Sequence, residues 1–467
     1  MTFQVSPGVQ VSEIDLTNVV PAVSSTTGAF AGQFQWGPVD EVVTVSDSKG
    51  LVENFHSPAN TDAGAEDFYS AESFLRYGSS LRIVRVNANA LYSANSSAHA
   101  TTLLKNFSQY ESSYEDGQLT GTVGRWISKS AGALGNTLKV SVCASSNAFF
   151  NDAVTTASAA EAAGQTTISV TASNVFTIRD IIRFAGHSTE YRVLTAPSGT
   201  TITIEALNQP AGTGLTEAVP NAANIDRYWE FYSYFSGAPG TSAGATNAGA
   251  GADEIHVVVV DEDGLFSGTT HTVLETFGFV SCASDAKDGQ GATSYYRNVV
   301  NQQSDYVYWT GHSTSIFTAA NEDITHAESV SDTFARPSAV INDSLSGGAN
   351  GRSGTALEKY TAWTDHFQDS ETLDISFLVV GSTRTDNGSG VDQDILTDWT
   401  TLANQAINLC EARKDCMVIL SPRRADVVGV TSESTQSSNV VTTGNTASSS
   451  SFSVMDSTWV YQYDRFN

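Results

Sequence analysis

The hydrophobic residues at the start of the chain alternate with polar residues, which is the pattern of a single β-strand. Val9 and Val11 share one parity and would line one face of that strand, with Gln10 and Ser12 on the other. A Pro7-Gly8 pair predicts a turn just before it. Because one isolated strand is not stable in water, residues 1–25 are predicted to form an extended arm that pairs with a sheet edge, in its own subunit or in another.

The periodicity of residues 26–95 predicts the order β-β-α-α-β. Asp47 can cap a helix through its carboxylate, and Gly78 can end a second, amphipathic helix. The predicted elements are strands Thr27–Phe34 and Glu41–Val45, helices Asp47–Phe55 and Glu66–Tyr77, and strand Leu81–Val86.

Residues 96–225 change character, because an Ala-rich linker is followed by short strands separated by Gly and Pro turns. Strands at this spacing suggest a small barrel or sandwich, which we interpret as an inserted all-β domain. The linker is Ala153–Ala163, and the strands are Thr166–Thr171, Ile178–Phe184, Tyr191–Thr195 and Thr201–Leu207.

Residues 226–345 return to mixed structure. A run of valines predicts a strand buried on both faces, and a Gly/Ala/Ser-rich stretch predicts a loop. We expect strands at Trp229–Phe235, Ile255–Val260 and Asp305–Trp309, a loop at Gly237–Gly251, a helix at Tyr295–Gln302, and either a strand or a helix at Leu274–Phe279.

Residues 346–467 predict a strand-helix-strand unit, which connects parallel strands. We expect helices at Thr355–Phe367 and Leu396–Arg413, a strand at Leu373–Val380, a buried strand at Cys416–Leu420 and a long loop at Val430–Ser451. The aromatic, β-prone segment from Trp459 to Asn467 is a poor place for a domain to end, so we expect the chain to be truncated.

Composition and charge narrow the function classes. The chain has 467 residues, of which 40% are hydrophobic, enough for two to four domains. Its 50 acidic and 23 basic residues give a formal charge of −27, which argues against a nucleic-acid partner. The sequence shows neither a membrane-spanning run nor a secretory signal. The four widely spaced cysteines are expected to be buried and reduced.

Catalytic chemistry finds little support in the sequence. The eight histidines form no metalloprotease motif, and we predict no catalytic, cofactor-binding or metal-ligating residue and no enzyme. Asp261-Glu262-Asp263-Gly264 could bind a hard cation, but a solvated turn is the better interpretation. Gly347–Gly354 resembles a phosphate-cradling loop only in its glycine content, and we interpret it as a linker. His256 could serve a triad, but a satisfied or edge histidine is favoured. Four aromatic residues could stack on sugars, although a place in the core is simpler: Tyr228, Trp229, Tyr232 and Tyr234.

Several motifs, taken in order, resemble one family. PGVQVSEID at 7–15 is followed by GAFAG at 28–32, WGPV at 36–39, VSD at 45–47, LVENF at 51–55 and RIVRV at 82–86. KSAGALGNTLKV at 129–140 and LSPRRADVV at 420–428 come later. Together they resemble the contractile bacteriophage tail sheath proteins, which form the outer sleeve of tails with a rigid inner tube.

The resemblance implies a multidomain α+β fold, with a mixed α/β sheath core, an inserted small all-β domain and an extended N-terminal arm. We expect an arm at 1–25, the sheath core at 26–95 and 226–345, the inserted domain at 96–225, and a βαβ-like domain at 346–467, truncated before a tube-contacting domain. The predicted intersubunit arm residues are Val5, Pro7, Gly8, Val9, Val11, Glu13, Ile14 and Asp15. The family-motif residues with predicted structural roles are Gly28, Gly32, Gly37, Pro38, Gly132, Gly135, Asn136, Ser421 and Pro422.

The function implied is that of a sheath subunit. Such subunits polymerise helically around the inner tail tube and contract to drive it through the host envelope for genome delivery. The expected partners are copies of the chain itself, the inner tail tube protein, and baseplate and tail terminator proteins, without nucleic acid, cofactor or membrane insertion. The expected location is the virion tail, assembled in the host cytoplasm. The alternative is a carbohydrate-binding or hydrolytic virion surface protein.

Overall fold

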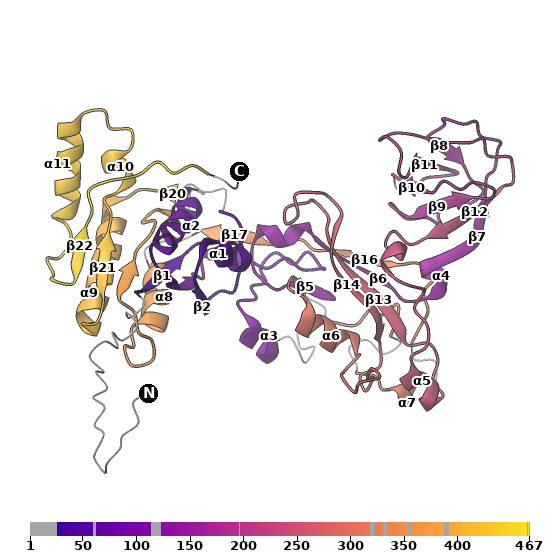
Figure 1. Cartoon of the computed structure of the whole chain (residues 1–467), viewed down its shortest axis with the longest axis horizontal. Coiled ribbons are helices and arrows are strands. Elements are labelled where there is room, and N and C mark those ends of the chain that lie inside the picture. Colours follow the sequence, from indigo (N-terminus) through magenta and orange to yellow (C-terminus); the bar gives the residue numbers. More distant parts are fainter. Residues whose placement is uncertain are drawn as a thin grey trace, which may run out of the picture. The chain divides into compact units, whose positions relative to one another are not determined.

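The computed structural model describes residues 26–58, 62–113, 123–195, 197–317, 323–329, 334–352, 357–386, 392–464 and 466. These residues divide into two compact units with mixed helices and strands (Figure 1). The first unit holds the described residues up to Phe34, residues 41–86 and those after Ser353, and the second holds residues 35–40 and 87–352. The coarse prediction of a mixed α/β, multidomain chain is therefore confirmed, and each unit is described by itself.

A six-stranded sheet forms the centre of the first unit, in the order β2-β3-β1-β18-β21-β22. All neighbouring strands are parallel except β2, which pairs with β3 in the antiparallel direction. The strands are β1 (Thr27–Gly32), β2 (Val42–Val45), β3 (Ser80–Arg85), β18 (Phe377–Val379), β21 (Met417–Leu420) and β22 (Ser453–Met455). The predicted parallel strand-helix-strand arrangement is confirmed.

Strand β1 is the central strand, because it pairs with β3 on one side and with β18 on the other. Five of its six residues are buried, as a parallel strand covered on both faces requires. Its glycines leave room for aromatic neighbours. A Cβ on Gly28 would lie 2.6 Å from Phe74 Cζ, and one on Gly32 would lie 2.5 Å from Phe30 Cε1.

Helices connect and cover these strands, with α2 against β1 and β3, α8 against β1, and α9 against α8 and β21. Asp47 caps α1 as predicted, because its Oδ1 accepts a 2.7 Å hydrogen bond from Gly50 N. The helices are α1 (Ser48–Phe55), α2 (Asp62–Leu75), α8 (Leu357–Phe367), α9 (Leu396–Arg413), α10 (Arg424–Val427) and α11 (Glu433–Gly444). Two short strands, β19 (Thr385–Asp386) and β20 (Asp392–Gln393), pair with each other.

Two predictions for the helices and sheet strands of this unit are wrong. The stretch Val430–Ser451 contains helix α11 rather than only a loop, because Ser432 caps it and Thr443 Oγ1 donates a 2.7 Å hydrogen bond to the buried Asp426. The strand at Cys416–Leu420 is buried on one face only, since Met417 and Ile419 are more than a third exposed. Helix α9 packs against β21 and covers its buried residues.

The second unit contains two larger sheets. The first is antiparallel, in the order β14-β13-β6-β16. Its central strand β13 is buried on both faces, as its valine run predicts. The strands are β6 (Leu138–Cys143), β13 (Glu254–Asp261), β14 (Thr272–Ser281) and β16 (Ile341–Ser344).

The second large sheet is also antiparallel, in the order β7-β12-β9-β10-β11-β8, and has its own hydrophobic core. Its strands are β7 (Phe150–Thr156), β8 (Thr167–Ser169), β9 (Ile181–Phe184), β10 (Tyr191–Val193), β11 (Thr201–Ala206) and β12 (Asn224–Tyr228). The first residues of the predicted linker Ala153–Ala163 belong to β7, because its backbone pairs with β12.

Shorter elements complete the second unit. Two strand pairs are β4 (Asn89–Tyr92) with β17 (Ala349–Arg352), and β5 (Trp126–Ser128) with β15 (Val307–Trp309). The helices are α3 (Phe107–Ser113), η2 (Ala133–Thr137), α4 (Ser146–Phe149), η3 (Tyr232–Tyr234), α5 (Ala243–Ala248), α6 (Tyr296–Gln303) and α7 (His326–Ser329).

The observed helices and strands of the second unit test several predictions. The helix at Tyr295–Gln302 is confirmed as α6, and the open choice at Leu274–Phe279 is a strand, β14. The predicted strand Trp229–Phe235 is wrong, because it contains the 3₁₀ helix η3. The predicted loop Gly237–Gly251 includes the short helix α5, which Ser242 caps by accepting a hydrogen bond from Ala245 N.

A buried ion pair joins four segments of the first unit. Lys359 Nζ lies 2.7 Å from Asp67 Oδ1 and donates to the carbonyls of Val380 and Ser382. Asp67 also accepts hydrogen bonds from Gln33 N and Ser382 N. Lys359 is 4% exposed and Asp67 is fully buried, so these contacts fasten α2 and α8 to the chain that follows β1 and β18.

We expect Lys359→Met to lower the free energy of unfolding by about 3–5 kcal/mol, because it leaves a buried carboxylate without its cation. Hydrogen-exchange protection of the β1 and β18 amides would measure the loss. The matched control is Lys49→Met, whose partner Glu53 is 3.2 Å away in an exposed pair, and which should cost less than about 1 kcal/mol. Equal losses in the two variants would contradict this assignment.

Candidate functional site

A cleft lies at the carboxyl ends of strands β18 and β21 in the first unit. Its volume is about 720 Å³, and it is lined by the segments that follow these strands, by α2 and by residues 458–462. Strand β3 lies on one side of β1 in the sheet, and strand β18, which comes later in the chain, lies on the other side. In parallel sheets, such a reversal of strand order opens a crevice at the carboxyl ends of the strands.

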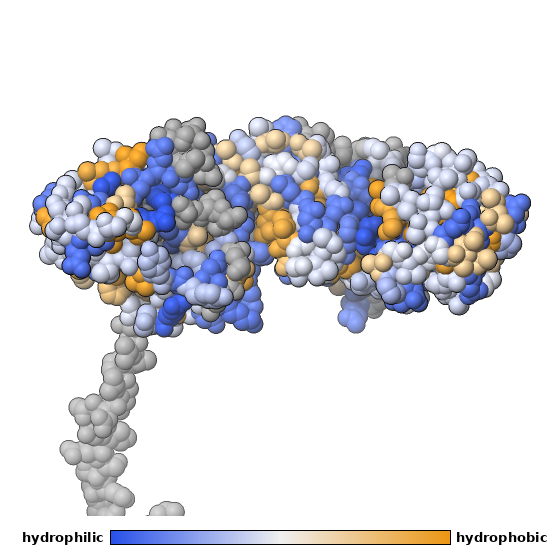
Figure 2. Space-filling view, turned by 90° about the horizontal axis from the view of Figure 1, so that it is seen from above, coloured by the Kyte–Doolittle hydropathy of each residue, from blue (hydrophilic) through white to orange (hydrophobic). Residues whose placement is uncertain are grey.

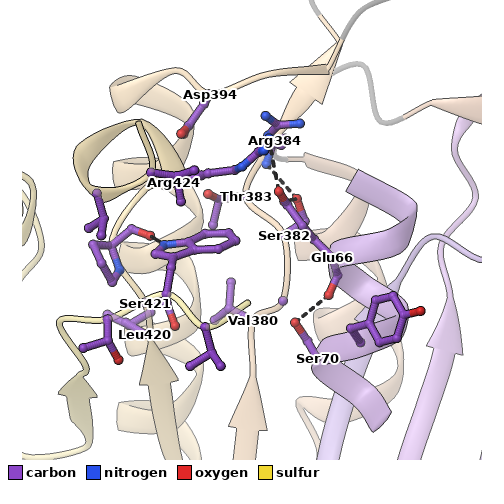
Figure 3. A pocket seen from close by; sticks show the side chains of 18 of the residues that line it. Glu66, Ser70, Val380, Ser382, Thr383, Arg384, Asp394, Leu420, Ser421 and Arg424 are labelled. Carbon is purple, nitrogen blue, oxygen red and sulfur yellow. Dashed lines mark hydrogen bonds and ion pairs between the residues drawn. The ribbon is translucent and has the colours of Figure 1, made fainter. Parts of the chain in front are cut away.

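Polar side chains converge in this cleft, as Figure 3 shows. Glu66 accepts a 2.6 Å hydrogen bond from Ser382 Oγ and lies 3.6 Å from Arg384 Nε. Burial raises the pKa of Glu66, although Ser382, Arg384 and Arg424 favour its charged form. In this view, Arg384, Arg424 and Asp394 lie near the upper end of the cleft, so the charged groups concentrate there.

The C-terminal segment runs along α2 at the border of the cleft. Trp459 Nε1 donates to Pro422 O at 2.9 Å, Gln462 Nε2 donates to Glu72 at 2.7 Å, and Asp464 accepts from Tyr69 at 2.6 Å. Phe466 packs edge-on against Phe68. Residues 459–464 and 466 form no strand, so the β-prone pattern does not give β-structure in this described part of the segment. Side-chain contacts, rather than a sheet edge, hold it.

The predicted motif residues of the first unit lie at crowded positions of the sheet and its carboxyl edge. Gly28 and Gly32 belong to β1, where any side chain would meet an aromatic ring. Ser421 and Pro422 directly follow β21, and their carbonyls accept hydrogen bonds from Trp399 and Trp459. The structure thus brings Ser421 and Pro422 to the cleft.

The other predicted motif residues lie in the second unit. Asn136 forms two hydrogen bonds with the backbone of Gly348, at 2.9 Å from its Nδ2 and 2.7 Å to its Oδ1. A Cβ on Gly135 would lie 2.9 Å from Ser128 Oγ, and Gly132 has a positive φ of 135°. Gly37, at a φ of 96°, precedes Pro38 in the chain entering this unit.

The predicted arm lies outside the described residues. Its residues are Val5, Pro7, Gly8, Val9, Val11, Glu13, Ile14 and Asp15. Their role stays a prediction.

Three curated proteins named tail sheath protein are similar to the chain, whereas no family model matches it. The protein of Salmonella phage ViI is 24% identical over 482 residues, which cover 100% of this chain and 67% of that protein. The protein of Enterobacteria phage T4 is 25% identical over 506 residues, which cover 99% of this chain and 70% of that protein. The protein of Vibrio phage KVP40 is 35% identical over 96 residues, covering 19% and 14%.

The chain is a homologue of phage tail sheath proteins. It spans about two thirds of the length of the two curated relatives that it matches throughout. Two solved structures described as sheath tail proteins, from Listeria innocua and Desulfitobacterium hafniense, are 10% identical to it. The superpositions cover 91% and 96% of this chain and 57% and 62% of the solved chains, with TM-scores of 0.33 and 0.34, respectively.

Asp261 of this sheath homologue anchors a turn. Its carboxylate accepts hydrogen bonds from Thr137 Oγ1, from Ser267 Oγ and from four consecutive backbone amides, those of residues 264–267. Burial would raise the pKa of Asp261, but these hydrogen bonds hold it below its usual value. The side chain is fully buried, so the prediction of a solvated turn is wrong for Asp261, and its oxygens are already occupied by protein donors.

His256 is a satisfied histidine in the core, which decides between the two predicted alternatives, a satisfied or an edge position. Its Nδ1 accepts from Phe279 N at 3.0 Å, its Nε2 donates to Gly237 O at 2.9 Å, and its ring stacks on Phe235 at 4.1 Å. Burial lowers the pKa of His256, which favours this neutral form.

A polar cluster around another histidine, His326, was not predicted, because its members are far apart in sequence. His326 lies between two carboxylates, 3.2 Å from Asp253 and 3.0 Å from Asp285. Ser242 and Ser281 donate their hydroxyl hydrogens to Asp253, not to the imidazole. A nucleophilic triad needs the hydroxyl beside the imidazole, so the contacts of these residues are those of a structural cluster.

The aromatic residues considered for sugar stacking divide between core and surface. Trp229 is 1% exposed and stacks on Phe235, which confirms its place in the core. Tyr228 and Tyr232 pack against each other with their ring centroids 4.8 Å apart. Tyr234 is 57% exposed, so its predicted place in the core is wrong.

We expect Asp261→Ala to destabilise the protein by about 3 kcal/mol, because several buried donors lose their acceptor together. Urea unfolding monitored by circular dichroism measures the change. Asp263→Ala is the control, since Asp263 is exposed and should stay within about 0.5 kcal/mol. If calcium raised the melting temperature of the unmodified protein and this effect vanished in Asp261→Ala, the structural role would be refuted.

Proposed function

We propose that this chain is a structural subunit of a contractile phage tail sheath. It polymerises helically around the inner tail tube and contracts to drive that tube through the host envelope for genome delivery. The observation that carries the proposal is similarity to two proteins named tail sheath protein over 100% and 99% of the chain. A non-enzymatic, structural role in the virion tail follows from it.

The proposed partners are further copies of the chain, the inner tail tube protein, and baseplate and tail terminator proteins. Assembly takes place in the host cytoplasm. The free cysteines support assembly in a reducing compartment, because the four are buried and unbridged.

We also propose the domain division predicted from the sequence, in which residues 96–225 form an inserted, mainly β surface domain. The six strands β7–β12 support it for residues 150–225, because they pair with one another and share a separate core around Ile182, Tyr191 and Ile204. Strand β6, in the earlier part of the range, pairs instead with β13 and β16. The remaining core segments and the βαβ-like domain keep the boundaries given above.

The arm of residues 1–25 is proposed as the joint between subunits. Pairing five or six residues would form about five backbone hydrogen bonds, worth roughly 0.5–1.5 kcal/mol each. Burial of Val9, Val11 and Ile14 would contribute roughly 1.5–3 kcal/mol each, and ordering the segment costs about 1–2 kcal/mol per residue. One joint is therefore worth only a few kcal/mol.

A lattice of such joints is strong although each one is weak, because every further contact forms at high effective concentration. Contacts that do not close on themselves generate helices. A tether between subunits can also stay engaged while rigid bodies move past each other, which is what a contracting sleeve requires.

Surface charge sets the conditions for assembly. The net charge of −27 makes identical subunits repel one another. On the face drawn in Figure 2, hydrophobic residues lie in separate patches among hydrophilic ones. Assembly therefore depends on the arm, on local complementary pairs and on screening by salt.

Deletion of residues 1–20 should abolish ordered sleeves seen by negative-stain electron microscopy. A sharper variant is Val9→Asp with Val11→Asp, which places charge on the apolar face of the arm. Gln10→Asp with Ser12→Asp is its control, because it adds the same charge to the polar face. Sleeves of the deletion variant that still form and contract as a unit would refute the arm as the joint.

Assembly should increase with salt, because the Debye length falls from about 30 Å at 0.01 M to about 8 Å at 0.15 M. Light scattering and sedimentation of the purified chain across this range would show it. A neutral osmolyte at matched osmolarity is the control, and assembly that weakens as salt is added would contradict charge repulsion as the barrier.

A further inference from the structure

Two buried cysteine thiols face each other at the end of helix α9. Cys410 lies in the last turn of that helix, and Cys416 directly precedes strand β21. Their sulfur atoms are 3.5 Å apart, and the residues are 0% and 3% exposed. A disulfide needs about 2.05 Å between sulfurs, so a small local movement would allow the bond to form.

The turn between the two cysteines creates this juxtaposition. Helix α9 ends at Arg413, and Lys414 takes the left-handed conformation with a φ of 66°. Lys414 N donates a 2.8 Å hydrogen bond to Cys410 O. The chain thereby reverses within a few residues and brings Cys416 back to Cys410.

Arg413 holds the turn in place and adds a positive charge beside the thiols. Its guanidinium group donates to both carboxylate oxygens of Asp415, at 2.9 and 2.8 Å, and to the carbonyls of Phe367, Asp369 and Leu373. Its side chain is fully buried. The turn is therefore fixed from several sides rather than free to separate the sulfurs.

The environment divides the cysteines into two classes. A hydrogen bond with Cys410 lowers the pKa of the Cys416 thiol, and Arg413 adds to this against the effect of burial. Burial instead raises the pKa of Cys143 and of Cys282 to about 12 each. Since the thiolate is the reactive form, Cys416 is favoured as the nucleophile over Cys143 and Cys282.

We propose that Cys410 and Cys416 form a reversible thiol–disulfide pair that reacts with hydroperoxides. The Cys416 thiolate attacks the peroxide oxygen, which breaks the O–O bond and gives a sulfenic acid and hydroxide. The Cys410 thiol then attacks the sulfenic sulfur, forming the S–S bond and releasing water. In sum, two thiols and one hydrogen peroxide give one disulfide and two waters, with both sulfurs oxidised and the peroxide reduced.

The bond would connect the end of α9 directly to the start of β21 in the first unit. A thiol reductant reverses the step by exchange. The chemistry of this turn does not depend on the proposed sheath function.

The test treats the folded full chain with limiting hydrogen peroxide, blocks remaining thiols under denaturing conditions, and maps the peptides by mass spectrometry. Trypsin cleaves after Arg413 and Lys414, so an intact bond holds together two peptides that separate on reduction. We expect the unmodified protein to fall from four free thiols to two, and the Cys410–Cys416 pair to account for the loss.

Two double variants act as matched controls. Cys143→Ser with Cys282→Ser should lose both of its remaining thiols, whereas Cys410→Ser with Cys416→Ser should keep both. Because the unmodified chain gives the primary result, the inference does not depend on the folding of a variant. Retention of all four thiols, oxidation of Cys416 to a sulfinic acid without bond formation, or a bond to Cys143 or Cys282 would each overturn it.

Discussion

The structure of the first unit depends on the pairing of one central strand, β1. Its backbone is buried, and a buried amide or carbonyl without a partner costs as much as a lost hydrogen bond. Its two neighbours, β3 and β18, come from opposite ends of the chain. The long segment between those neighbours, residues 87–352, forms most of the second unit. The first unit is therefore complete only when the late segments have returned to the sheet.

Buried charge follows from the same constraint. At the carboxyl edge of β1 and β18, the chain leaves backbone groups that no strand satisfies. Lys359 and Asp67 bind these groups and each other. The ion pair therefore supplies the hydrogen bonds that a neighbouring strand supplies elsewhere in the sheet. The cleft beside them is the space left where the strand order reverses. Its polar lining is explained by the same backbone groups at the carboxyl ends of the strands, which need hydrogen-bond partners from side chains.

Titratable side chains in the described residues serve mainly as internal acceptors and donors. Asp261 accepts hydrogen bonds from the backbone of a turn, and His256 packs between aromatic rings. Asp253 forms hydrogen bonds with two serines and His326. Asp261 and His256 were weighed as sites of chemistry on the sequence alone. The hydrogen-bond partners show that their polar atoms are engaged in structure. The Cys410–Cys416 pair differs, because two thiols face each other with their sulfur atoms 3.5 Å apart.

The sequence by itself determined the elements whose pattern is strong and local. Leu396–Arg413 is a helix with the predicted bounds, the valine run at 255–260 is a doubly buried strand, and Asp47 caps its helix. The order of short motifs determined the sheath resemblance. Regular periodicity and capping act within a few residues, so they can be read without the fold.

Only the tertiary structure decided features that depend on distant partners. The polar stretch 433–444 is a helix because Asp426 and neighbouring carbonyls hold it, and residues 150–156 are a strand because β12 pairs with them. The roles of Lys359, His326 and Cys416 likewise depend on which groups the fold places beside them. Composition and periodicity describe a segment's own preferences, whereas these outcomes were set by contacts between segments that the sequence keeps apart.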